Sequence, residues 1–121
     1  MMHASMIAGL TITHTGTSIP HAMSYPVTYE LNIPHGRACG LFLPGFVSAY
    51  KNKDDVNECL NLLGFNSESE FKDYMVQLLG IVEIHDELID TCAQGLIENK
   101  AKLKNFPFEI TKEELKGLLA K

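Results

Sequence analysis

Cysteine is scarce in this sequence and poorly placed for cross-linking. Cys39, Cys59 and Cys92 are odd in number, lie far apart and form no CxxC pair. Disulfide frameworks use paired cysteines in oxidising compartments, so this pattern favours a reducing, cytoplasmic location. We expect all three residues to be small members of a hydrophobic core.

Long apolar runs and a surplus of positive charge are missing as well. The longest apolar stretch, residues 38–47, is interrupted by Pro44, so the sequence predicts neither a signal peptide nor a membrane-spanning helix. Ten basic residues stand against fifteen acidic ones, and the formal net charge of -5 argues against a nucleic-acid partner. The expected partners therefore include no membrane and no nucleic acid.

Several motifs that carry chemistry are also absent. The chain has no G-x-G-x-x-G, no P-loop, no G-x-S-x-G and no H-E-x-x-H, so it contains no nucleotide-phosphate cradle or hydrolase motif of its own. Alternating β patterns of useful length are missing too, and 121 residues amount to about one domain. We therefore predict a single all-α domain over residues 1–121.

Helix signals are frequent along the whole chain. Apolar periodicity, prolines at helix starts and glycines at helix ends divide it into helical segments. Ser67 with Glu70, and Thr111 with Glu114, have the spacing of capping boxes. The predicted helices cover residues 2–14, 20 to about 29, 36–50, 54–64, 67–80, 86–95, 98–104 and 111–120.

Charge is nearly absent from the first fifty residues. Only Glu30 and Arg37 are ionised there, although the same stretch holds four of the five histidines. A self-sufficient small domain usually keeps one charged, solvent-facing side on every helix. The first three predicted helices therefore indicate a neighbour that covers them, either another domain or another copy of the chain.

Two of these histidines form a candidate metal site. His35 follows Pro34 at a predicted helix start, where the positive end of the helix dipole favours the neutral imidazole that metals require. His21 shares a helix face with Tyr25 at i, i+4. Two histidines do not complete a site, so structural roles remain open for both. His14 is either a cofactor or substrate neighbour or a polar residue at a helix end.

Three runs in the first fifty residues carry a resemblance to a known family. They are Ala4-Ser5-x-x-Ala8-Gly9, Thr15-Gly16-Thr17-x-x-Pro20-His21-Ala22-Met23-x-Tyr25 and Ile33-Pro34-His35-Gly36-Arg37-Ala38-x-Gly40-Leu41-x-Leu43-Pro44. A looser likeness continues to Ile110-Thr111-Lys112-Glu113-Glu114-Leu115. Taken together, these runs resemble the iron-containing alcohol dehydrogenases, in the part that forms their C-terminal helical domain.

The resemblance implies a two-domain enzyme with the dehydroquinate synthase-like fold. Its N-terminal α/β half binds NAD or NADP, and its C-terminal helical half holds Fe²⁺, Zn²⁺ or another divalent ion through one aspartate and three histidines. His21 and His35 match the last two of those histidines. The other two ligands belong to a D-x-x-x-H pattern on an earlier helix, and no histidine here has an aspartate four residues before it. We therefore expect a fragment that lacks the nucleotide-binding domain.

The resemblance also bears on Tyr25. Many members of the family have a histidine at this position, near the reacting substrate. A phenol there can still donate or accept a hydrogen bond, but it does not titrate near neutral pH as imidazole does. Tyr25 is thus a candidate substrate-side residue, with a buried aromatic whose hydroxyl meets a carbonyl as the alternative.

For a complete enzyme, the resemblance implies NAD(P)-linked oxidation of an alcohol or reduction of an aldehyde. The chain alone is expected to be inactive, because it lacks the cofactor domain. A function of a different class stays open. In this alternative, the chain is a stand-alone helical interaction or metal-binding module, which forms a homo-oligomer or pairs with a separate partner through its charge-poor N-terminal residues.

Overall fold

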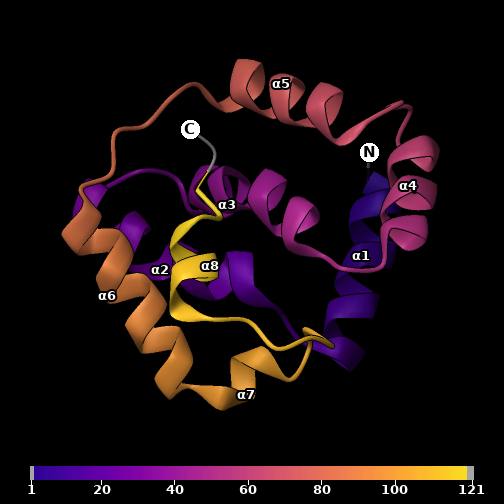
Figure 1. Cartoon of the computed structure of the whole chain (residues 1–121). Helices are drawn as coiled ribbons and strands as arrows, with labels where there is room; N and C mark the ends of the chain where they lie inside the picture. Colours follow the sequence, from indigo (N-terminus) through magenta and orange to yellow (C-terminus); the bar gives the residue numbers. More distant parts are fainter. Residues whose placement is uncertain (1, 120–121) are drawn as a thin grey trace.

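The computed structural model describes residues 2–119, except the side chains of Lys100 and Lys102. Within that range the chain is helical and contains no strand, which confirms the predicted all-α class. Figure 1 shows the helices in order: α1 (Met2–Thr15), α2 (Ile19–Leu31), α3 (His35–Ala49), α4 (Lys53–Leu62), α5 (Glu68–Leu79), α6 (Asp86–Glu98), α7 (Lys100–Leu103) and α8 (Lys112–Lys116). None of the described helices is long and apolar enough to cross a bilayer.

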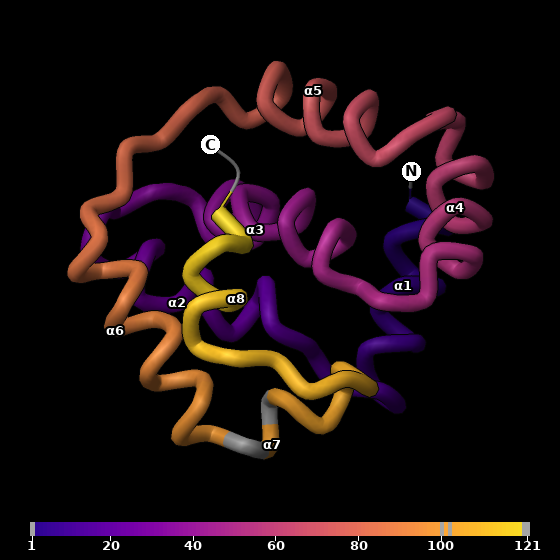
Figure 2. The backbone as a smooth tube through the Cα atoms, viewed as in Figure 1, coloured from indigo at the N-terminus to yellow at the C-terminus, as the bar shows by residue number. Residues whose placement is uncertain are grey.

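The α2–α3 pair lies at the centre of the fold. α2 packs against α3 and α6, α3 packs against α5, and α6 packs against α8. In the view of Figure 2 the chain from α4 to α7 circles this pair. On α2, Ile19, Met23 and Val27 are fully buried at i, i+4 and i+8, a spacing that places them on one face of the helix. The rest of the main core is Ala38, Leu41, Phe42, Ile89, Cys92, Ala93, Leu96, Phe106, Leu115, Leu118 and Leu119.

Local signals set most helix boundaries. Thr111 and Glu114 form the predicted capping box, with Thr111 Oγ1 accepting from the Glu114 N–H and the Glu114 carboxylate accepting from the Thr111 N–H. The second predicted box is only half confirmed. Ser67 Oγ accepts from the Glu70 N–H, but the Glu70 carboxylate accepts from the N–H of Asn66.

Two predicted helix ends differ from the structure by three or more residues. α6 continues to Glu98, because Gly95 does not take the left-handed conformation that ends a helix at Gly64 and Gly80. α8 ends at Lys116 rather than at residue 120, and Leu118 and Leu119 follow it in a turn that places both in the core. The predicted end at Ala120 lies outside the described residues.

The cysteines occupy different environments, and only Cys92 fits the expected core role. Cys92 is buried, whereas Cys39 is half-buried and Cys59 is exposed. The core prediction is wrong for Cys59, because Val56 and Leu60 are the buried residues of α4 and Cys59, beside them, is exposed to solvent.

Helix α1 stands outside the core. None of its described residues is buried, and its large apolar side chains are exposed. Its far end is held by Asn105, whose Nδ2 donates to the carbonyl oxygens of Thr15 at 2.7 Å and Thr17 at 2.9 Å. The exposed apolar side chains are those of Met2, Met6, Ile7, Leu10 and Ile12.

Candidate metal centre

The α2–α3 hairpin brings together residues from three separate helical turns. The connection between the two helices is short, and Asn32 takes the left-handed conformation with φ 50°. α3 then returns antiparallel along α2, since His35 meets Thr28 and Ser24, and Cys39 meets Ser24 and His21. His35 is the first residue of α3 and Cys39 lies one turn later on the same face.

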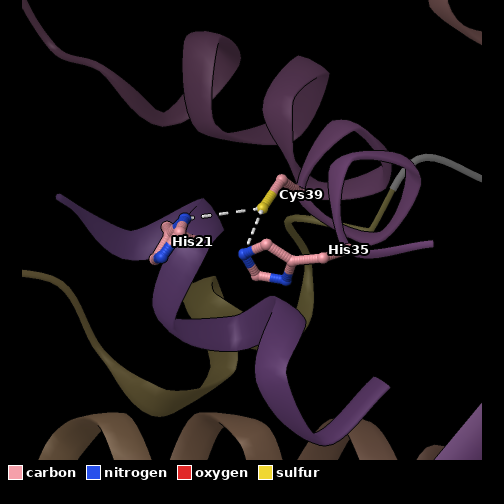
Figure 3. A group of neighbouring side chains, drawn as sticks. All are labelled: His21, His35 and Cys39. Atoms are coloured by element: carbon pink, nitrogen blue, oxygen red, sulfur yellow. Dashed lines mark hydrogen bonds between the residues drawn. The ribbon is translucent and has the colours of Figure 1, made fainter. Parts of the chain in front are cut away.

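Cys39 lies between the two predicted metal ligands (Figure 3). Its Sγ is 3.7 Å from His21 Nδ1 and 3.6 Å from His35 Nε2. The two imidazole rings are 4.6 Å apart and nearly perpendicular. One potential ligand atom from each of the three side chains lies within 4.8 Å of the others, and all three residues are half-buried. The structure therefore brings His21 and His35 together, as a shared site requires.

Ser24 favours one tautomer of His35. Its side chain is fully buried, and its hydroxyl donates to the His21 carbonyl at 2.8 Å. A hydroxyl has one hydrogen, so Ser24 Oγ can only accept at its 3.3 Å contact with His35 Nδ1. The contact therefore favours the tautomer with the ring hydrogen on His35 Nδ1, where Thr28 Oγ1 at 3.4 Å can also accept it, and with the lone pair on Nε2 facing Cys39. Buried hydrogen bonds of this kind commonly orient metal-binding histidines.

Tyr25 closes the other side of the cluster. Its hydroxyl is 2.7 Å from His21 Nε2, and its ring stacks on His35 at a centroid distance of 5.3 Å. The side chain is 50% exposed. The alternative of a buried aromatic bonded to a carbonyl is therefore wrong, because the hairpin turns Tyr25 outward and its hydroxyl meets an imidazole.

The other histidines lie outside this cluster. His14 is exposed near the end of α1, where its Nδ1 is 3.0 Å from the Leu10 carbonyl of the same helix. His85 is exposed directly before α6. Within the described residues, the group formed by His21, His35 and Cys39 is the one arrangement of histidine, cysteine and acidic side chains close enough to share an ion.

Sequence reasoning missed Cys39. Its interpretation as a core residue came from the wide spacing of the cysteines, but His35-x-x-x-Cys39 has the i, i+4 spacing that places two side chains on one helix face. That local signal was present in the sequence. The approach of Cys39 to His21 was not, because it depends on how α3 packs against α2.

Fold and site together define a helical domain with a candidate transition-metal site at its central hairpin. The chain belongs to the Fe-containing alcohol dehydrogenase family, because residues 1–121 match the sequence profile of the C-terminal part of that family. This match confirms the resemblance seen in the sequence. It also accounts for the all-helical fold.

Curated relatives are alcohol dehydrogenases and aldehyde reductases. The chain is 31% identical to the 4-hydroxybutyrate dehydrogenase of Clostridium kluyveri over 82% of its own length. It is 27% identical to the sulfoacetaldehyde reductase of Bilophila wadsworthia over 98% of its length. It is 31% identical to the phosphonoacetaldehyde reductase of Streptomyces viridochromogenes over 66% of its length.

The chain corresponds to only part of each relative. The aligned regions cover 31%, 36% and 20% of the three relatives in the same order, so the chain matches between a fifth and about a third of their length. No solved structure matches the chain significantly.

Proposed function

We propose that this chain is the metal-binding helical part of an NAD(P)-linked enzyme that interconverts alcohols and aldehydes. The observation that carries the proposal is the meeting of His21 and His35 across the α2–α3 hairpin, at the positions that resemble family ligands. Two imidazole nitrogens suit Fe²⁺ and Zn²⁺ alike. The lone pair of His35 Nε2, favoured by Ser24, fits such an ion.

Each site residue has a proposed task. His21 and His35 hold the ion, while Ser24 and Thr28 keep the His35 ring in its orientation. Tyr25 offers a half-exposed hydroxyl on the substrate side of His21, where it can donate or accept a hydrogen bond. A bound ion would act as a Lewis acid on the alcohol or carbonyl oxygen.

The remaining machinery is proposed to come from outside these residues. The described cluster contains no carboxylate, and the sequence has no phosphate-binding motif for a nicotinamide cofactor. We propose that a nucleotide-binding domain supplies the cofactor site across a shared cleft, and that the two missing ligands come from a further helix of the helical half. His14 is proposed to lie on the cofactor side of that cleft, since α1 presents it at the surface.

The chain alone is expected to show no turnover. We predict no change in nicotinamide absorbance with NAD⁺ or NADP⁺ and 4-hydroxybutyrate, or with NADH or NADPH and sulfoacetaldehyde, in the presence of Fe²⁺ or Zn²⁺. The control is a fusion in which the chain replaces the matching part of the C. kluyveri dehydrogenase. There we expect metal-dependent turnover that His21→Ala and His35→Ala remove. Robust turnover by the chain alone would contradict the need for a second domain.

A second candidate function, an interaction module, is favoured by the exposed apolar side of α1. Ile7 and Leu10 are 61% and 59% exposed on a helix with no described charged residue, and apolar patches of this kind commonly mark interfaces. The module hypothesis predicts self-association that Ile7→Glu with Leu10→Glu abolishes, as measured by sedimentation at increasing protein concentration. A monomer at every concentration would count against it.

A further inference from the structure

The distances from the Cys39 sulfur to the two histidine nitrogens match those of a tetrahedral zinc site. Zinc holds thiolate sulfur at about 2.3 Å and imidazole nitrogen at about 2.0–2.1 Å, which puts sulfur and nitrogen about 3.6 Å apart at the tetrahedral angle. Cys39 Sγ is 3.7 Å from His21 Nδ1 and 3.6 Å from His35 Nε2. All three donor atoms lie within 4.8 Å of one another, close enough for side-chain movement to bring them around one ion.

The hydrogen bonds around the cluster fit tautomers whose lone pairs face Cys39. The tautomer of His35 that donates from Nδ1 to Ser24 has its lone pair on Nε2. His21 Nε2 lies 2.7 Å from the Tyr25 hydroxyl, which can accept the ring hydrogen and leave the lone pair on Nδ1, beside Cys39. Ser24 Oγ, 3.2 Å from the sulfur, has already given its hydrogen to a carbonyl. The Cys39 sulfur thus faces hydrogen-bond acceptors on His21, His35 and Ser24, and lone pairs gathered in this way favour a bound cation.

We infer that Cys39 is a third protein ligand, so that His21, His35 and Cys39 together bind Zn²⁺ within this chain. The inference rests on the proposed metal role of the two histidines and adds a sulfur donor to it. Binding forms a Zn–S bond and releases the thiol proton to solvent, with no redox change. Within this chain alone, three protein ligands leave one position of a tetrahedral ion open for a further ligand. A thiolate also selects zinc over Mg²⁺ or Mn²⁺, which prefer oxygen donors.

Cobalt substitution tests the sulfur ligand directly. The purified chain, kept reduced, is titrated with Co²⁺ as wild type, as Cys39→Ser and as Cys59→Ser. Wild type and Cys59→Ser should develop a thiolate-to-cobalt charge-transfer band in the near ultraviolet, and Cys39→Ser should lack it. Cys59→Ser is the matched control because Cys59 is exposed on α4 and outside the cluster.

Zinc affinity and thiol protection give independent readouts. Cys39→Ser and Cys39→Ala should weaken Zn²⁺ binding by more than about a hundredfold, beyond the usual cost of losing a residue that only orients a ligand. In the Cys59→Ser background, Zn²⁺ should slow alkylation of Cys39. Cys92 should not be alkylated at an appreciable rate in that assay, because burial raises the pKa of its thiol to about 11.

The outcomes separate this inference from the proposed function. The sulfur ligand is overturned by two results together: the wild-type cobalt complex lacks the charge-transfer band, and a Cys39→Ser variant with native circular dichroism binds metal as tightly as wild type. The histidine site is then left standing. Failure of the wild-type chain to bind either ion overturns the three-residue site as well. Unchanged binding in His21→Ala and His35→Ala would instead remove the metal role of the histidines on which both proposals rest.

Discussion

Alanine at either His21 or His35 is expected to abolish metal binding by the purified chain. Each substitution removes a nitrogen within 3.7 Å of Cys39 Sγ and leaves two donors from this cluster, too few to hold a tetrahedral ion tightly. Metal content after purification should fall from about one ion per chain to background in both single variants. The double variant should be no worse than either single variant, because the ligands act as a unit.

Unfolding measurements provide a second readout for the same substitutions. An ion that binds only the folded state raises the free energy of unfolding by about 2.7 kcal/mol when its free concentration is a hundred times its Kd. Wild type should show this gain with Zn²⁺, and His21→Ala and His35→Ala should not. Both side chains are only half-buried, so without metal the variants should unfold close to wild type.

His14→Ala and His85→Ala are the matched controls for these variants. Each removes an exposed imidazole outside the cluster, and His14 is tied only to its own helix through the Leu10 carbonyl. Both controls should keep wild-type metal content. If all four alanine variants keep the same metal content as wild type, the His21–His35 site is refuted, and surface coordination becomes the explanation for any bound ion.

Helix positions were predictable because the signals are local. Pro20 and Pro34 mark two starts, Thr111 with Glu114 marks another, and Gly64 and Gly80 mark two ends through left-handed conformations. Each signal acts within a turn or two of its own helix, so reading it needs no knowledge of the tertiary fold. The pairing of His21 with His35 was predicted from their local contexts in a charge-poor segment and was strengthened by the resemblance to a family with ligands at those positions.

Features that depend on tertiary packing could not be predicted from the sequence. Cys39 approaches His21 only because α3 returns antiparallel along α2, and the spacing of the cysteines contains no trace of that contact. Likewise, the segment after Lys116 leaves its helix so that Leu118 and Leu119 can enter the core, where the Leu118 backbone lies against Gly45 of α3. Whether a glycine is essential or dispensable also depends on what its missing side chain would meet.

Gly45→Ala is expected to destabilise the fold, whereas Gly95→Ala should stabilise it. A Cβ built on Gly45 of α3 overlaps the backbone of Leu118, including its carbonyl oxygen, and backbone cannot swing away as a side-chain tip can. Overpacking of this kind costs about 1–3 kcal/mol. At Gly95 of α6 an added Cβ meets nothing within 4 Å, so alanine should gain about 1 kcal/mol from its higher helix propensity.

Urea unfolding followed by far-ultraviolet circular dichroism measures the two variants on the same scale. Equal stability of Gly45→Ala and Gly95→Ala would show that the segment around Leu118 does not pack against α3 as described. Metal binding gives a further distinction. Gly45 lies ten residues after His35, about 15 Å along the helix at 1.5 Å per residue. The folded fraction of Gly45→Ala should therefore keep its Zn²⁺ affinity, because the strain falls at the C-terminal contact and not at the hairpin that carries His21, His35 and Cys39.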